Sequence, residues 1–363
     1  MLQFLFIFFV LLFALALSNK SAGFTLAGKD GKSVYILCFL FLGLLAAFRS
    51  PIVGNDTKEY IRIFQDCRDL LDNGTRFEYG YLYYNLFIHK ITGNYQVFFI
   101  ITSIFLFATY GVITWKYSFR PKLAVLFFFI LAFPGTVNTM RQCFAICILL
   151  FSLDYIIKRR WIFFIFIVLF ASLFHVTAII FLVVYPLSYL RINRMTVLLF
   201  VVAALVCYIM FADLLEIGFS YFTMYEYYSQ GKYFEGETRV ASMVKVVFSV
   251  TIFLVAYYSY KRSTKEWKQT IEGKRYTLIL LLEMIAVVID FLSLKVNLLD
   301  RLDLYFSALS FVLFSNAVTL MPVHCRRIVT MALLSLYVSY NCVAMTIRPD
   351  WNRIYPIELV WNF

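Results

Sequence analysis

The feature that most constrains this chain is a series of apolar runs, each about 15 to 22 residues long, separated by short polar segments. A helix rises about 1.5 Å per residue, so a run of about 20 apolar residues is long enough to cross the hydrocarbon core of a bilayer. Apolar residues make up 62% of the chain and charged residues only 15%. Soluble domains contain about a quarter charged residues. The sequence therefore predicts an all-α, polytopic membrane protein.

Reading each apolar run as one span predicts about twelve transmembrane helices. No basic residues precede the first run, so we expect a retained helix there rather than a signal peptide. One pair of expected helices meets at Pro134–Gly135, and another pair meets at His175. In each case the alternative is a single broken element that lines a cavity. No linker or repeat divides the chain, which predicts one membrane domain over residues 1–363. The expected spans are 2–17, 34–48, 96–115, 122–136, 137–157, 161–175, 176–190, 195–213, 241–260, 276–294, 303–321 and 328–347.

The connections between these runs differ in charge. An excess of lysine and arginine is typical of cytoplasmic loops. The longer segments 49–95 and 214–240 are mixed or acidic, and we expect them outside the cell. This topology accounts for the net charge of +12, so we expect no nucleic-acid partner. The basic connections are Lys20–Lys32, Lys116–Lys122, Lys158–Arg160, Arg191–Arg194, Lys261–Arg275 and Arg326–Arg327.

The first external segment, residues 49–95, is too long and too polar to be a simple connector, and it is expected to form amphipathic helices. Asp56 or Thr57 is the expected cap of the first helix, which Asn73–Gly74 ends. Its apolar positions form one face suited to lying on the membrane surface: Tyr60, Ile63 and Phe64. A tyrosine-rich second helix is expected after Glu78.

Residues 134–186 place Asn138, Arg141 and His175 within otherwise apolar helices. Burying an ionisable group in a membrane is costly unless a partner or a water-filled cavity compensates, so such a residue marks a candidate functional site. Asn138 and Arg141 are three positions apart and share one helix face. A lone histidine at position 175 is equally compatible with a packing role.

Under the expected topology the unusual polar residues fall at or near the external ends of their helices. They are Arg49, Asp56, Glu78, Asn138, Arg141, His175, Glu235, Arg239, Asp300 and Arg301. No phosphate-binding loop, dinucleotide glycine pattern, zinc-protease motif or nucleophile elbow is present in the sequence. The seven cysteines are scattered without disulfide or metal-ligand spacing. We therefore expect no cofactor and no metal.

Several blocks follow one another in a recognisable order from Arg49 onward: FRSPIVGNDTKEYIRIF, then Glu78-Tyr79-Gly80, FPGTVNTMRQCFAICILL, FASLFHVTAIIFLVVYP, LLDRLDLYFSAL and NRIYPIELVW. Their most specific part is Asn-x-x-Arg-Gln followed by Phe-His-x-Thr-Ala. In this order the chain resembles the EpsG family of bacterial polysaccharide-biosynthesis membrane proteins, which is grouped with the Wzy-type O-antigen and capsule polymerases.

The resemblance implies a GT-C-like glycosyltransferase architecture in the bacterial cytoplasmic (inner) membrane, with the active site facing the periplasm or the exterior. It implies a polymerase that moves a glycan from one polyprenyl diphosphate carrier to a repeat unit on another. The implied partners are an undecaprenyl diphosphate-linked oligosaccharide, the lipid bilayer and a chain-length regulator protein. Two alternatives stay open: a flippase or transporter of the same lipid-linked glycan, and an O-antigen ligase-like transferase.

The same blocks carry candidate site residues over to this chain, namely Asp56, Glu78, Asn138, Arg141, Gln142, His175 and Arg301. A diphosphate leaving group needs cationic donors, and arginine binds phosphate oxygens through two hydrogen bonds. The diphosphate-binding candidates are Arg141 and Arg301, followed by Arg49 and Arg239.

An acceptor hydroxyl needs positioning and a general base. The catalytic candidates are His175, Asp56 and Glu78, and we favour His175 because imidazole titrates near neutral pH. Asn138 and Gln142 are candidates for positioning the acceptor. Thr57 stands where many lipid-sugar transferases have a second carboxylate, which leaves the identity of the base open.

Overall fold

The computed structural model describes residues 1–17, 32–211, 240–296, 299–348 and 353–360. These residues form helices and one isolated β-bridge, between Arg49 and Leu359, which confirms the all-α prediction. The chain divides into two compact units: unit 1 comprises Met1–Ile179 with Phe314–Phe363, and unit 2 comprises Ile180–Leu313. One domain over residues 1–363 stays a prediction. The expected external segment 214–240 lies outside the described residues except for Val240.

Within the described ranges, five helices are long and apolar enough to cross a membrane. They are α6 (Tyr95–Tyr117), the stretch Met140–Ile157, α16 (Val240–Arg262), α18 (Ile271–Ser293) and α21 (Val323–Ile347). A sixth arises if α19 (Asp300–Ser307) and α20 (Ser310–Leu320), which are bent by 49°, form one span. Shorter apolar helices are α1 (Leu2–Leu17), α2 (Lys32–Ala47), α7 (Pro121–Leu131), α11 (Trp161–Ser172), η1 (Val176–Val183) with α12 (Val184–Leu187), and α13 (Arg194–Ile209). The protein is thus a multi-pass helical membrane protein.

Short polar residues set where several of these helices begin. The Asn94 side chain accepts the N–H of Gln96 at the start of α6, at 2.9 Å. Asn193 does the same for Thr196 at the start of α13, and Thr270 for Gly273 at the start of α18. Each contact satisfies one of the N–H groups that a helix leaves unpaired in its first turn.

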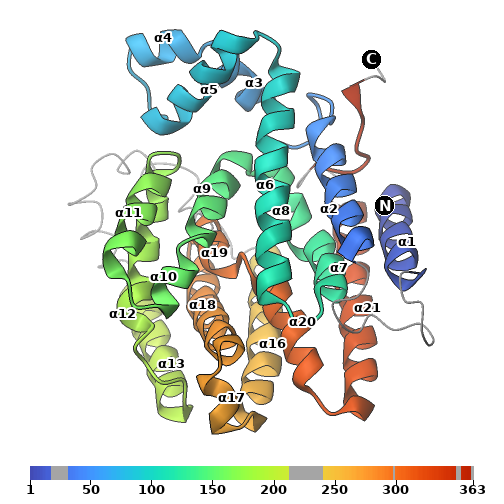
Figure 1. The fold of residues 1–363 in the computed structure, drawn as a ribbon, viewed down its shortest axis with the longest axis vertical. Coiled ribbons are helices and arrows are strands. Elements are labelled where there is room, and N and C mark those ends of the chain that lie inside the picture. Colours follow the sequence, from blue (N-terminus) through green and yellow to red (C-terminus); the bar gives the residue numbers. More distant parts are fainter. Residues whose placement is uncertain (18–31, 212–239, 297–298, 349–352, 361–363) are drawn as a thin grey trace. The chain divides into compact units, whose positions relative to one another are not determined.

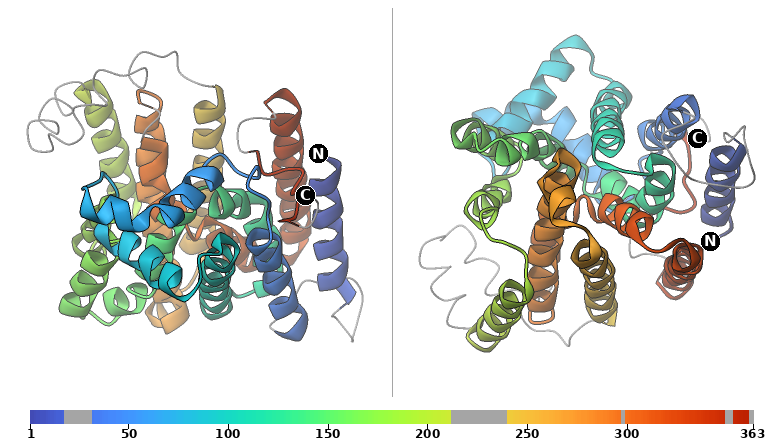
Figure 2. Two further views of the ribbon diagram at one scale, coloured as in Figure 1. Left: turned by 90° about the horizontal axis from the view of Figure 1, so that it is seen from above. Right: turned by 60° about the horizontal axis from the view of Figure 1, so that its bottom comes forward.

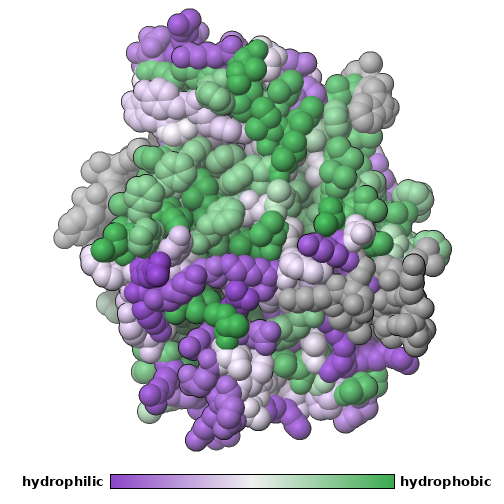
Figure 3. Space-filling view, in the orientation of Figure 1, coloured by the Kyte–Doolittle hydropathy of each residue, from purple (hydrophilic) through white to green (hydrophobic). Residues whose placement is uncertain are grey.

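In unit 1, three short helices form a layer across the end of α6, as Figure 1 shows: α3 (Thr57–Gln65), α4 (Cys67–Asp72) and α5 (Tyr79–Ile91). Seen from above, these helices lie flat (Figure 2). Hydrophilic side chains gather on the outer side of the layer, whereas the flank of α6 and α2 below it is apolar (Figure 3). Below this layer α6 packs against α2 and α9 (Met140–Leu150), and α9 packs against α11.

The apolar face of α3 does not lie on the membrane surface as expected. Tyr60, Ile63 and Phe64 are buried, because α3 packs on α5 and α6. Burying this face stabilises the layer as part of unit 1. The expected single helix up to Asn73–Gly74 is wrong in one detail, because α3 ends at Gln65 and a second short helix, α4, follows from Cys67; the end of the helical segment at Asn73 is confirmed, since α4 ends at Asp72.

The two helix junctions have different outcomes. Pro134 and Gly135 lie inside a short helix, α8 (Phe133–Asn138), and the helical run is interrupted on both sides of it, at Ala132 after α7 and at Thr139 before α9. Proline is tolerated in the first turn of a helix, where its missing N–H needs no partner, so Pro134 follows a helix start rather than marking an end. The junction at His175 is confirmed as a break, because α11 ends at Ser172 and a 3-10 helix follows from Val176.

In unit 2, α18 lies between α13 and α16 (Figure 2) and also packs against α17 (Lys265–Gln269) and α19. The Tyr276 hydroxyl donates to the Ala256 carbonyl at 2.8 Å, which links α18 to α16. The expected helix 303–321 is wrong in detail: it starts earlier, at Asp300, and bends between Ser307 and Ser310.

Candidate functional site

Glu78 joins three segments of unit 1. Its Oε2 accepts a hydrogen bond from Arg141 Nη1 at 2.6 Å, and its Oε1 accepts the N–H of Val176 at 2.9 Å. Glu78 immediately precedes α5, Arg141 lies in α9, and Val176 follows the break after α11. The side chains of Arg141 and Glu78 keep 21% and 13% of their exposure, so the ion pair is shielded yet accessible. We call Glu78, Arg141 and His175 the Arg141 site.

Gly80 allows α5 to approach this break closely. A Cβ added at position 80 would lie 2.6 Å from the Leu173 carbonyl oxygen, closer than real Cβ contacts come. The next residue, Tyr81, donates its N–H to the same carbonyl at 3.2 Å. The Glu-Tyr-Gly block thus supplies both the carboxylate that holds Arg141 and the small residue that lets the two segments meet.

Aromatic rings and Glu78 fix the orientation of the Arg141 guanidinium. Its central carbon lies 5.2 Å from the centre of the Phe77 ring and 5.8 Å from that of Tyr81. Aromatic faces attract cations, so these rings support the charge where water is partly excluded. Guanidinium carries five N–H donors. Among the described residues the Arg141 side chain makes one hydrogen bond, to Glu78, which leaves Nε and Nη2 as donors for an incoming anion.

His175 lies at the break itself, one residue from the Val176 N–H that Glu78 accepts. Its Nδ1 is 2.8 Å from the Thr177 hydroxyl oxygen, which fixes the orientation of the ring. The side chain is half-buried. The structure therefore brings His175 to the same three-segment junction as Glu78 and Arg141.

Asn138 orders the loop that carries Asp56. Its side-chain oxygen accepts the N–H of Asn55 at 2.7 Å, and its carbonyl accepts the Tyr60 hydroxyl at 3.2 Å. Asp56 stands at the capping position of α3, but its side chain makes no capping hydrogen bond. Of the two expected caps, Asp56 and Thr57, Asp56 is confirmed at the capping position and Thr57 is the first helical residue, but the expected side-chain hydrogen bond is wrong. Asp56 is half-buried beside this loop.

Arg49 is buried to 1% exposure and tightly held. It donates to the Ala46 carbonyl at 2.5 Å and to the Thr57 hydroxyl at 3.3 Å. It also lies 4.3 Å from the centre of the Phe99 ring. Burial lowers the pKa of Arg49 to about 10, so it stays protonated at neutral pH. These contacts favour anchoring of the external loop, and diphosphate binding by Arg49 stays a prediction.

The C-terminal block pairs with the first external loop. The N–H of Ser50 donates to the Glu358 carbonyl at 2.7 Å, and the N–H of Val360 donates to the Phe48 carbonyl at 2.9 Å. The Gly54 N–H donates to the Arg353 carbonyl at 2.8 Å. Gly54 has a φ of 86°, a left-handed conformation that favours glycine. Blocks that lie far apart in the sequence thus meet in unit 1.

The remaining candidates are not brought to this junction by the contacts described. Gln142 is buried in α9. Arg301 is exposed on α19, in unit 2. Arg239 and Glu235 lie outside the described residues.

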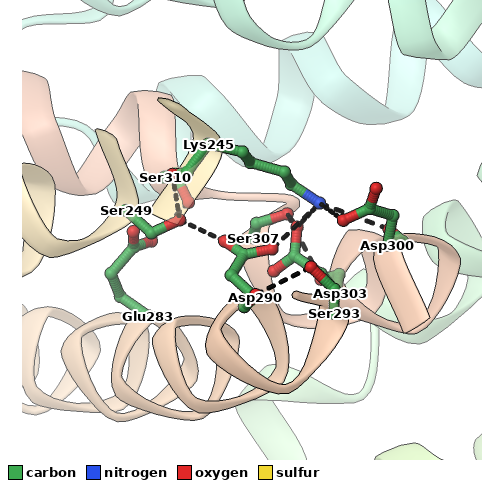
Figure 4. Close-up of polar contacts among 9 residues, drawn as sticks. All are labelled: Lys245, Ser249, Glu283, Asp290, Ser293, Asp300, Asp303, Ser307 and Ser310. Atoms are coloured by element: carbon green, nitrogen blue, oxygen red, sulfur yellow. Dashed lines mark hydrogen bonds and ion pairs between the residues drawn. The ribbon is translucent and has the colours of Figure 1, made fainter. Parts of the chain in front are cut away.

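Unit 2 holds a second set of ionisable residues, two of them fully buried, of which the sequence analysis names Asp300 alone (Figure 4). The Lys245 ammonium in α16 lies 2.9 Å from Asp290 in α18, 3.0 Å from Asp303 and 3.4 Å from Asp300 in α19. We call these four residues the Lys245 cluster.

Hydroxyl groups complete the surroundings of the buried carboxylates in unit 2. Ser249 donates to Asp290, and Ser307 donates to Asp303 at 2.9 Å. Glu283, also buried, accepts a hydrogen bond from Ser310. Buried charges need partners of this kind. The signal available in the sequence was the charge of Lys245, Glu283 and Asp290 within expected membrane spans.

An arginine–carboxylate pair held at a helix break, in a multi-pass helical protein, defines this chain as an integral membrane protein with a partly buried ionic site. The chain belongs to the EpsG family, which matches residues 32–359 and so confirms the resemblance seen in the sequence. Membership indicates a polysaccharide polymerase-type membrane protein. No curated protein and no solved structure matches the chain.

Proposed function

We propose that this protein is a polysaccharide polymerase that transfers a glycan from a polyprenyl diphosphate donor to a lipid-linked repeat unit. The observation that carries the proposal is Arg141, which is held by Glu78 at the His175 break and keeps unused donors. Negative charge develops on the diphosphate as the glycosidic bond breaks. A guanidinium fixed in advance stabilises that charge without reorganising during the reaction.

The residues of the Arg141 site then take distinct roles. The acceptor hydroxyl oxygen attacks the anomeric carbon, the bond from that carbon to the diphosphate oxygen breaks, and the hydroxyl proton passes to a base. His175 is the favoured base because it lies at the break, and Asp56 is the alternative. Both oxygens of Glu78 already accept hydrogen bonds, which favours a positioning role for this residue.

We place the Arg141 site on the external face of a bacterial inner membrane. The support is charge: α6 begins beside the layer formed by α3, α4 and α5 and ends at the basic connection Lys116–Lys122. The shorter apolar helices would bring the spans to about twelve, in a GT-C-like arrangement. The same proposal includes an undecaprenyl carrier and a chain-length regulator protein as partners. It also includes further diphosphate contacts from Arg301 and Arg239, and acceptor contacts from Asn138 and Gln142.

The test is a polymerisation assay with purified protein in sealed vesicles. Short-chain polyprenyl diphosphate-linked repeat units are added outside, with and without EDTA, and the products are separated on a gel. We expect a ladder of products. Repeat units that stay single but cross the bilayer would instead indicate a flippase, and transfer to a lipid-A core without a ladder would indicate a ligase. A ladder that forms only when substrate reaches the lumen of right-side-out vesicles would reverse the orientation.

The close approach at Gly80 gives a further prediction. Gly80→Ala should lower polymer formation at least about tenfold, because the new methyl group pushes α5 from Leu173 and displaces Glu78 from Arg141. Gly135→Ala is the matched control, since its Cβ would meet nothing within 4 Å and it also replaces a helical glycine. The same gel assay, normalised to protein amount, measures both variants. Equal activity of the two would show that the approach at Gly80 does not shape the site.

A further inference from the structure

A cavity of about 510 Å³ opens in unit 2, at the start of α13 and the end of α16. Its lining includes Asn193, Arg194, Tyr257, Tyr260, Lys261 and Lys268. Asn193 and Arg194 lie at the start of α13, Tyr257, Tyr260 and Lys261 lie in α16, and Lys268 lies in α17. None of them is part of the Arg141 site or of the Lys245 cluster.

Among the residues that the structure describes, the lining of this cavity carries only positive charge. Arg194, Lys261 and Lys268 supply three cations, and the described lining contains no aspartate or glutamate. Within the described chain none of these three residues forms an ion pair. The Lys268 ammonium lies 4.3 Å from the centre of the Tyr260 ring, and partial burial lowers the pKa of Lys268. An anion in the cavity would supply the missing countercharge.

The surroundings of the cavity favour an anion attached to a lipid. Tyr257, Tyr260 and Lys261 lie at the end of α16, where a span of this length reaches the membrane surface. Beside the cavity α13 exposes a run of large apolar side chains that acyl chains would cover: Met195, Leu198, Leu199 and Val202. Basic pockets between helices at a cytoplasmic membrane surface are suited to phosphate headgroups.

We propose that this cavity binds the phosphate headgroup of an anionic membrane lipid. The three cations and the tyrosine hydroxyls contact the phosphate and the glycerol of the headgroup, while the apolar face of α13 contacts the acyl chains. This proposal does not depend on the polymerase reaction, since it concerns different residues.

The experiment measures thermal unfolding of the purified full chain in detergent during titration with short-chain phosphatidylglycerol. Phosphatidylcholine with the same acyl chains, inorganic phosphate and pyrophosphate are the comparison ligands. We expect saturable stabilisation by phosphatidylglycerol alone, because a ligand that binds only the folded state raises its stability. Equal stabilisation by phosphatidylcholine would overturn the proposal, and equal stabilisation by phosphate or pyrophosphate would replace the lipid with a soluble anion.

Matched variants separate the cavity from general surface charge. The triple variant Arg194→Gln, Lys261→Gln and Lys268→Gln should weaken the apparent affinity at least about tenfold. The control triple variant, Arg262→Gln, Lys265→Gln and Lys274→Gln, removes the same charge from neighbouring positions outside the lining and should bind as the parent does. Equal weakening in both would overturn the proposal. If the first triple variant does not fold, the single variant Lys268→Gln replaces it. We expect a smaller loss of apparent affinity for phosphatidylglycerol in that variant, and unchanged affinity would overturn the proposal.

Discussion

Replacing Arg141 with lysine should lower polymer formation about a hundredfold while leaving the amount of folded protein unchanged. Lysine keeps the positive charge and can still pair with Glu78, so the contact that joins α5 to α9 survives. Lysine lacks the planar guanidinium group. In Arg141, Nε and Nη2 of that group can donate to two phosphate oxygens at once while Nη1 stays bonded to Glu78. Loss of a preorganised donor acts on the transition state, so the turnover number should fall more than the apparent affinity for donor.

The matched control for this variant is Arg62→Lys. Arg62 also pairs with a glutamate, Glu59, but it is exposed on the outer side of α3. Exposed pairs contribute little, so polymer formation and melting temperature should match those of the parent. Full activity of Arg141→Lys would remove Arg141 from the diphosphate site, and equal loss in Arg62→Lys would mean that any change in the external layer impairs the enzyme.

Helix existence and the membrane class follow directly from the apolar runs, because burying backbone polar groups in lipid requires helices. The break at His175 was also predictable. The contact between Glu78 and Arg141 was not, since 63 residues separate them and their spacing carries no local signal. Both residues were candidates, yet only the folded chain shows that Glu78 holds Arg141 and the Val176 N–H together.

The misplaced features have physical reasons of their own. Proline at position 134 has two opposite meanings, helix end or first helical turn, and the sequence pattern does not distinguish them. The apolar face of α3 has the same pattern whether it meets lipid or protein, and here α5 and α6 cover it. Lys245 was overlooked because its partners lie on other helices, Asp300 being 55 residues away.

The largest effect on stability is expected from Lys245→Met. The Lys245 side chain is 32% exposed, whereas Asp290 and Asp303 are 0% and 1% exposed. Removing the ammonium leaves two buried carboxylates without a cation, and breaking a buried ion pair in this way costs about 3–5 kcal/mol. The free energy of unfolding should fall by that amount, measured by chemical unfolding in micelles. Because the cluster joins α16, α18 and α19, these helices should separate first.

A compensated variant distinguishes lost charge pairing from a simple change of shape. Adding Asp290→Asn and Asp303→Asn to Lys245→Met removes the unpaired charges while amide oxygens still accept from Ser249 and Ser307, so most of the stability should return. Lys274→Met, at an exposed lysine of α18, is the control and should leave the unfolding transition unchanged. If Lys245→Met unfolds like the parent, the cluster does not hold these helices together. If the compensated variant is no more stable than Lys245→Met, packing by the lysine stem rather than its charge is what matters.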